Sequence, residues 1–152
     1  MKTKSIYILL LLCCASICFA QDKLFEQYAD MDDVTSVYIS KKMFDLMPDI
    51  ETGGLDLKDL RGKIDNLQIL TTDREDLCAK MRKDFKNLVT QSHEELMRIK
   101  DGKDKVTFYV QQENELIREM LMFADSDDEF VIIRLKGKFT LEDIQKIAKQ
   151  VQ

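Results

Sequence analysis

Residues 94–111, EELMRIKDGKDKVTFYVQ, decide the fold that the sequence predicts. Asp101-Gly102 lies near the middle, and both residues tolerate the positive φ angles of a tight turn. The flanking segments 94–100 and 105–111 are therefore predicted to pair as an antiparallel hairpin. Apolar and polar residues alternate from Val106 to Gln111, which indicates a strand with one buried face and one partly solvated face.

Two further strands are predicted downstream of this hairpin, at residues 115–124 and 130–135. The polar turn 125–128 joins them, and Asp and Ser are common in such turns. Together with the hairpin, these strands predict a four-stranded antiparallel meander.

Two helices are predicted to cover the sheet. Thr72-Asp73-Arg74-Glu75 has the spacing of a capping box, and apolar residues recur every three or four positions from there to about Gln91. Thr140 is predicted to cap a last helix, with an apolar stripe that extends to Val151. Both helices are expected on the same face of the sheet. The predicted fold class is thus α+β: a two-layer, mainly antiparallel sheet with helices packed on one face.

The segment between the leader and the first predicted long helix has shorter elements. Residues 63–70 form another predicted strand, and residues 49–59, with Gly53-Gly54 inside them, are the most loop-like part of the chain. The other elements expected here are a short helix, a strand and a helix that ends at Pro48, at residues 24–29, 34–39 and 41–47.

The first twenty residues resemble a secretory leader. Lys2 and Lys4 precede an apolar run, and Cys18-Phe19-Ala20 places small residues before a cleavage point at Gln21. We expect residues 1–20 to be a cleaved signal peptide and residues 21–152 to form a single α+β domain, periplasmic or secreted, with no stable membrane insertion after cleavage. The alternatives are a retained anchor, for which the apolar run is short, and a lipid anchor, for which none of the leader cysteines follows a small residue.

Charge and cysteine content exclude several classes of function. The net charge is −5, and removal of Lys2 and Lys4 with the leader would make it more negative, so nucleic-acid binding is not expected. Of four cysteines, only Cys78 lies beyond the leader. A mature chain with one cysteine has no intramolecular disulfide and must be stabilised by a packed core.

Residues that could carry chemistry each have a simpler interpretation. His93 is the only histidine, and it is expected to be an exposed loop residue or a weak helix cap rather than a zinc ligand or catalytic base. Cys78 lies beside an apolar helical stripe, where a thiol is more often inert packing than a nucleophile. We therefore assign no catalytic, cofactor-binding or metal-binding residue and expect no cofactor.

Two acidic clusters suggest calcium, because carboxylates are its preferred ligands. They consist of Asp30, Asp32 and Asp33, and of Asp125, Asp127, Asp128 and Glu129. The second cluster lacks the glycine and the distant glutamate of an EF-hand loop, so a solvated turn is the favoured interpretation.

Two segments of the chain are similar to a known family. Residues 24–41, LFEQYADMDDVTSVYISK, and residues 130–140, FVIIRLKGKFT, resemble the opening and closing motifs of the domain-of-unknown-function 4252 family of small exported bacterial proteins. The resemblance implies a place in the cell envelope of Gram-negative gut anaerobes, and it assigns no activity and no catalytic residue. Some relatives carry lipoprotein leaders, a pattern from which this leader departs.

These observations favour a non-catalytic interaction or sensory accessory module with an envelope protein as its partner. The sheet, a strand edge or the glycine loop would bind that partner. The segment Met120–Phe123 is suggestive of an adaptable surface, although core packing is the favoured interpretation. The alternative is a small carboxylate-dependent hydrolase of the periplasm, since two carboxylates need only be close in space.

Overall fold

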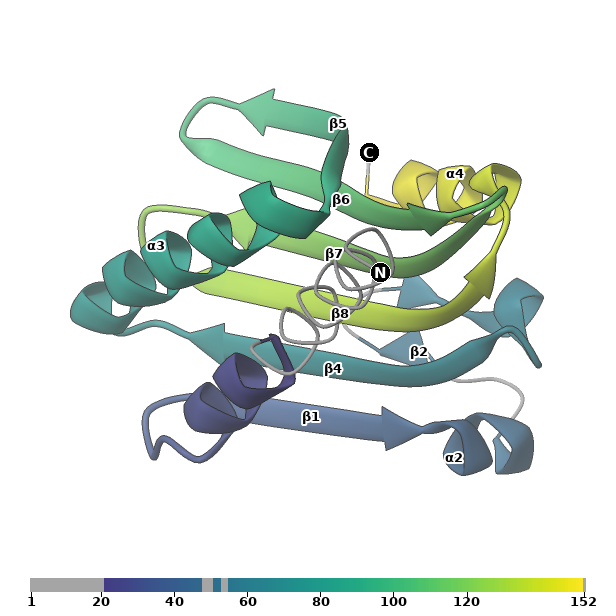
Figure 1. The fold of residues 1–152 in the computed structure, drawn as a ribbon. Coiled ribbons are helices and arrows are strands. Elements are labelled where there is room, and N and C mark those ends of the chain that lie inside the picture. Colours follow the sequence, from purple (N-terminus) through teal and green to yellow (C-terminus); the bar gives the residue numbers. More distant parts are fainter. Residues whose placement is uncertain (1–20, 48–50, 53–54, 152) are drawn as a thin grey trace, which may run out of the picture.

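A computed structural model of the chain describes residues 21–47, 51–52 and 55–151. A six-stranded sheet forms its centre, and every strand pair in it is antiparallel (Figure 1). In spatial order the strands are β1 (Thr35–Ser40), β4 (Ile64–Thr72), β8 (Phe130–Phe139), β7 (Leu116–Asp125), β6 (Asp104–Glu113) and β5 (Glu94–Asp101).

The meander predicted from the hairpin is confirmed. Strands β5 to β8 are consecutive neighbours, and Gly102 has the positive φ of 60° that its turn requires. Asn114 makes the turn between β6 and β7 with a φ of 58°. The strand β4 pairs with β8, so the meander is extended by β4 and then by β1, which ends the sheet.

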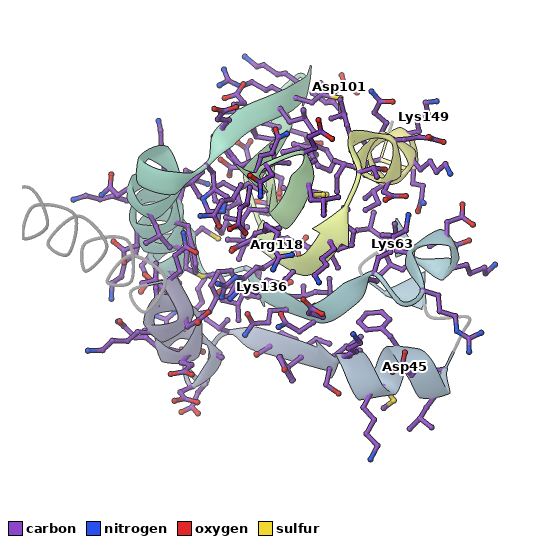
Figure 2. The ribbon with its side chains drawn as sticks, turned by 45° about the vertical axis from the view of Figure 1, so that its right-hand side comes forward. Asp45, Lys63, Asp101, Arg118, Lys136 and Lys149 are labelled. Atoms are coloured by element: carbon purple, nitrogen blue, oxygen red, sulfur yellow. The ribbon has the colours of Figure 1, made fainter. Side chains whose placement is uncertain are left out.

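The α+β class and the antiparallel sheet are confirmed, but the helices do not all lie on one face. The helix α3 (Glu75–Ser92) and the helical segment 21–29 cover one face, and α4 (Leu141–Lys149) covers the opposite face (Figures 1 and 2). The helix α2 (Lys41–Leu46) belongs with α4, because Phe44 packs in the same cluster. The expected two-layer arrangement is therefore corrected to three layers.

The physical reason is that the central strands are apolar on both sides. Adjacent residues of a strand point to opposite faces, yet both members of the pairs Ile69-Leu70, Leu121-Met122 and Ile132-Ile133 are buried. Ile69, Met122 and Ile133 pack in the cluster under α4, and their neighbours pack in the cluster under α3. A helix on one face alone would have left the other apolar face in water. We call these surfaces the α4 face and the α3 face.

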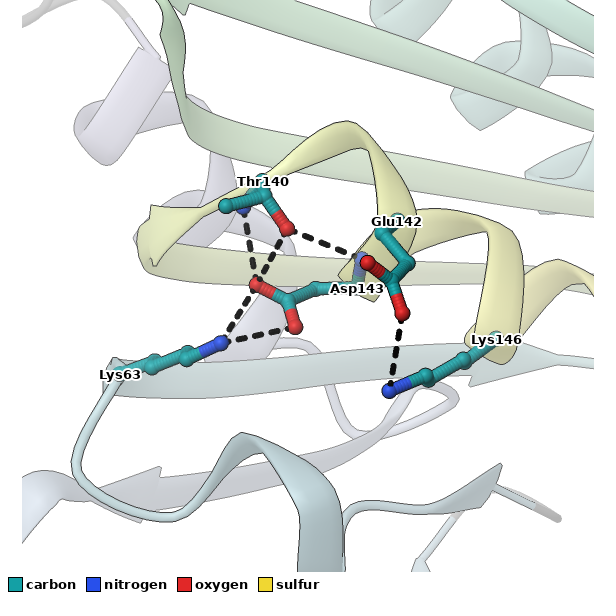
Figure 3. A network of polar contacts seen from close by, with 5 residues as sticks. All are labelled: Lys63, Thr140, Glu142, Asp143 and Lys146. Carbon is teal, nitrogen blue, oxygen red and sulfur yellow. Dashed lines mark hydrogen bonds and ion pairs between the residues drawn. The ribbon is translucent and has the colours of Figure 1, made fainter.

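Figure 3 shows the start of α4, where the predicted cap is confirmed. The Thr140 hydroxyl accepts a hydrogen bond from the Asp143 amide, and the Asp143 carboxylate accepts one from the Thr140 amide at 2.9 Å. Lys63 donates to both oxygens of that carboxylate at 2.8 Å. Burial alone would raise the pKa of Asp143, but Lys63 and Thr140 outweigh it and lower the pKa.

The capping box predicted at Thr72 is wrong. The helix α3 begins at Glu75, and its cap position is held by Arg74, whose side chain makes no capping hydrogen bond. Thr72 instead ends β4 and donates its hydroxyl to the Asp33 carbonyl at 2.9 Å. The strand β4 thus continues two residues further than predicted. It includes Thr72, which the sequence pattern placed at the start of the helix.

The segment expected to be loop-like has short elements of its own. The strands β2 (Glu51–Thr52) and β3 (Leu55–Asp56) pair with each other, and a 3₁₀ turn follows at Lys58–Leu60. Leu55, Leu57 and Leu60 are buried in the α4 face. Gly53-Gly54 and residues 48–50, with Pro48, lie outside the described residues.

Candidate functional site

The two edges of the sheet differ in a way that bears on binding. An edge strand presents unpaired backbone groups that can bind another strand, and proteins usually protect such edges with charges, prolines or bulges. The edges here are β1 and β5, because each pairs with only one neighbour in the part of the chain that the structure describes.

The edge strand β5 is protected. Five of its eight residues, Glu94, Glu95, Arg98, Lys100 and Asp101, are charged. The ladder between β5 and β6 is interrupted by a register shift after Glu95, and Arg98 forms an ion pair with that same carboxylate. A partner strand added here would have to accommodate both the charges and the irregular backbone.

The edge strand β1 has no such protection. Its six residues, TSVYIS, include no charge and no proline, and its register with β4 continues without a shift from Thr35 to Ser40. Val37 is 37% exposed and Tyr38 is 62% exposed. The outer side of β1 is therefore a regular, uncharged edge with apolar side chains on both faces.

The helix α2 continues this apolar surface. Phe44 anchors the helix in the core, while Met43, Leu46 and Met47 are exposed, Leu46 by 70%. The helix follows β1 directly and lies at the same edge of the sheet (Figure 1). We call Val37, Tyr38, Met43, Leu46 and Met47 the β1–α2 surface. Apolar side chains that gather at one place on a surface often mark an interaction site.

A buried ion pair lies on the α3 face, away from this edge. Arg134 on β8 is 1% exposed and donates from Nε to Oε1 of Glu119 on β7 at 2.8 Å. The same guanidinium contacts Gln68 at 3.2 Å and Asp22 at 2.8 Å, and it lies 4.7 Å from the ring centre of Phe25. The pair connects three strands to the helical segment 21–29.

His93 belongs to this buried cluster, which corrects the expectation of an exposed loop histidine. Its side chain is 0% exposed, and its Nε2 lies 3.7 Å from Oε1 of Glu119. Its backbone does occupy the C-terminal cap of α3, with its amide bonded to the Val89 carbonyl. Burial alone would raise the pKa of Glu119, but His93 and Arg134 outweigh burial, and the pKa is lowered.

Cys78 lies on the buried side of α3, and its Sγ donates to the Thr72 carbonyl at 3.3 Å. Burial raises the pKa of this thiol, so it stays protonated near neutral pH. The segment Met120–Phe123 is buried and contributes to both faces of the core.

Carboxylates of both acidic clusters form ion pairs with basic side chains. Asp33 pairs with Arg74 and Asp125 with Arg82, in both cases at 2.5 Å, and Asp127 pairs with Lys103. Within the described ranges, no three His, Cys, Asp or Glu side chains lie close enough together to hold a metal ion.

Of three comparisons with known proteins, one gives a match. The sequence model of the family described as "Domain of unknown function (DUF4252)" matches residues 28–147. No curated protein and no solved structure matches the chain significantly. Among the described residues, no helix is long and apolar enough to cross a bilayer. Because the match covers most of its length, the chain belongs to the domain-of-unknown-function 4252 family.

Proposed function

We propose that this member of the domain-of-unknown-function 4252 family is an exported, non-catalytic interaction module of the cell envelope, and that it binds an extended segment of a partner protein along β1. The observation that carries the proposal is the difference between the two edges of the sheet. Five charges and a register shift protect β5, whereas β1 is uncharged and regular.

The geometry of β1 suits the addition of a strand. Backbone hydrogen bonds along an edge give affinity, and side chains on the two faces give specificity. Ile39 packs against the α4 face, so Val37 lies on that same side of β1 and Tyr38 on the other. A bound strand would therefore meet an apolar side chain on each face, and the exposed residues of α2 extend the contact beyond the strand.

The leader supports the envelope setting of the proposal. Cleavage ahead of Gln21 would release a periplasmic or secreted chain in which Asp22 remains available to Arg134 and Lys136. Intact-mass measurement on protein from the native envelope should give a chain that begins at Gln21 and carries no acyl group. A lipid-modified cysteine at the N-terminus would contradict this part of the proposal.

No observation favours the carboxylate-dependent hydrolase over binding. The most buried carboxylates, those of Glu119 and Asp143, are each held by a cation, Arg134 and Lys63 respectively. Their pKa values are lowered, so both groups are ionised at neutral pH and unsuited to donate a proton.

Site-specific photocrosslinking in living cells tests the proposed surface. A benzophenone side chain replaces Tyr38 on β1 in one variant and Leu96 on β5 in the other, so that each edge carries one probe. We expect a discrete crosslinked protein from position 38 and none from position 96.

A charge on β1 should weaken this binding. Adding V37K to the variant with the probe at position 38 should reduce the amount of its crosslinked adduct by about tenfold, because the charge would be buried against the partner strand.

A matched control is available on the other edge. Leu96 is 38% exposed and Val37 is 37% exposed, so L96K introduces the same charge at a similar depth. It should leave the adduct at position 38 unchanged. Equal loss with L96K, or no adduct at position 38, would contradict binding at β1. Turnover of a glycan or peptide by the purified protein would favour the hydrolase instead.

A further inference from the structure

A second candidate site lies under α3, at the opposite end of the sheet from β1. A pocket of about 200 Å³ opens between α3 and strands β5, β6 and β7. Four cations line it: Arg82 and Lys86 from α3, Arg98 from β5 and Lys105 from β6. Asp125 is the one carboxylate among its lining residues. The pocket is thus basic, although the chain as a whole has a net charge of −5.

Two of these cations are already neutralised. The guanidinium of Arg82 donates to both oxygens of Asp125, at 2.7 and 2.5 Å, and Arg98 pairs with Glu95. Lys86 and Lys105 form no ion pair with any residue that the structure describes. Because these two lysines come from different elements and line one pocket, an anion bound there would be attracted by both charges.

The floor of the pocket is aromatic. The ring centres of Tyr109 and Phe123 are 5.2 Å apart, and those of Phe123 and Phe130 are 5.9 Å apart. The Arg82 guanidinium lies 5.9 Å from the centre of the Phe130 ring, so this side chain joins the basic rim to the floor. Such a floor favours an apolar or aromatic part of a ligand over a bare inorganic ion.

We propose that this pocket binds a small aromatic or apolar organic anion, with its carboxylate or phosphate at Lys86 and Lys105 and its ring against Tyr109 and Phe123. The pocket is smaller than the ~300–1,000 Å³ of typical ligand sites, so the ligand is small. At the rim, Asp125 holds the Arg82 guanidinium in place and neutralises its charge, so the positive charge available to a ligand comes from the two lysines.

Titration with phenyl phosphate, followed by heteronuclear NMR, tests the site. We expect saturable shifts at the amides of Lys86, Lys105 and Tyr109, with inorganic phosphate and phenol each binding at least about tenfold more weakly. Replacing either lysine, K86Q or K105Q, should weaken phenyl phosphate binding by about tenfold and reduce its dependence on salt.

The control is K42Q, because Lys42 lies on α2 at the other edge of the sheet and is exposed. It should leave binding unchanged. Equal affinity for the three probes, or an equal loss in K42Q, would overturn the proposal, since either result means non-specific attraction to charge or to rings. The variant Y109L separates the two halves of the site: it should weaken phenyl phosphate and leave inorganic phosphate unaffected. This outcome is independent of partner binding at β1.

Discussion

Arg134 is a charged residue in the core, and polar partners compensate for its burial. It lies between Glu119 on β7 and Gln68 on β4, and Asp22 reaches it from the helical segment 21–29. A buried ion pair contributes little stability by itself, but removal of one member leaves the other charge buried without compensation.

A double-mutant cycle should reveal this coupling. The variant R134M should lower the free energy of unfolding by about 3–5 kcal/mol, because Glu119 would lose its closest cation while remaining buried. The double variant R134M/E119M should recover much of that loss. Urea denaturation gives each value. If the losses measured in R134M and in E119M simply add up in the double variant, the two side chains are not coupled.

Acid should weaken the fold through the same carboxylate. The pKa of Glu119 is lowered in the folded protein, so its contribution is present above the unfolded pKa of about 4 and is lost as the pH falls through the folded value. Unfolding free energies measured from pH 7 down to pH 2 should therefore decline in acid. The decline should be shallower in E119Q than in the wild type.

Glu142 provides the control for that pH series. Its side chain is 77% exposed on α4, so E142Q should follow the wild-type acid curve. The account would be contradicted if E119Q and the wild type lost stability in parallel.

At the scale of elements, the start of α4 depends on one reciprocal cap. T140A should lower the free energy of unfolding by about 0.5–2 kcal/mol, because the Asp143 amide would lose its acceptor. Ser40 offers the matched control, since it occupies the same position before α2 but makes no capping hydrogen bond with its side chain. S40A should be close to neutral in thermal or urea unfolding. Equal losses in the two variants would argue against a role for the cap.

The two threonines that fit a cap pattern show what sequence alone could predict. Thr140 and Thr72 both precede an acidic residue at the third position and an apolar stripe. Only Thr140 caps, because Thr72 is held in β4 by its pairing with Phe130 and by its bond to the Asp33 carbonyl. The local sequence pattern predicts the positions of the helices and strands to within a few residues. The residue at which β4 ends depends on tertiary pairing.

His93 and Arg134 show why the buried polar cluster could not be predicted from the sequence pattern. His93 follows a helix and precedes a charged strand, which is a typical surface context. It is buried only because α3 lies across the sheet and brings its last turn to Glu119. The presence of Arg134 within the apolar run from Phe130 to Leu135 was the available signal that a buried partner was needed.

At the scale of the whole molecule, helices cover both faces of the described sheet, so only its edges are open to a partner strand. The α3 face and the α4 face both pack under helices, which leaves β1 and β5 as the two sides of the sheet open to another strand in the described part of the chain. The sequence predicted the meander that ends in β5. It could not show that β1 forms the opposite edge, because that depends on the long-range pairing of β4 with β8.

The most direct test of binding at β1 is amide hydrogen exchange on the partner complex isolated from the native envelope, compared with the free protein. We predict that the amides of residues 35–40 that point away from β4 exchange at least about tenfold more slowly in the complex, because a bound strand would pair with these outer backbone groups of β1. Residues 94–101 of β5 should exchange at the same rate in both samples. Unchanged exchange at residues 35–40, with protection gained at β5 or on a helix, would contradict the account.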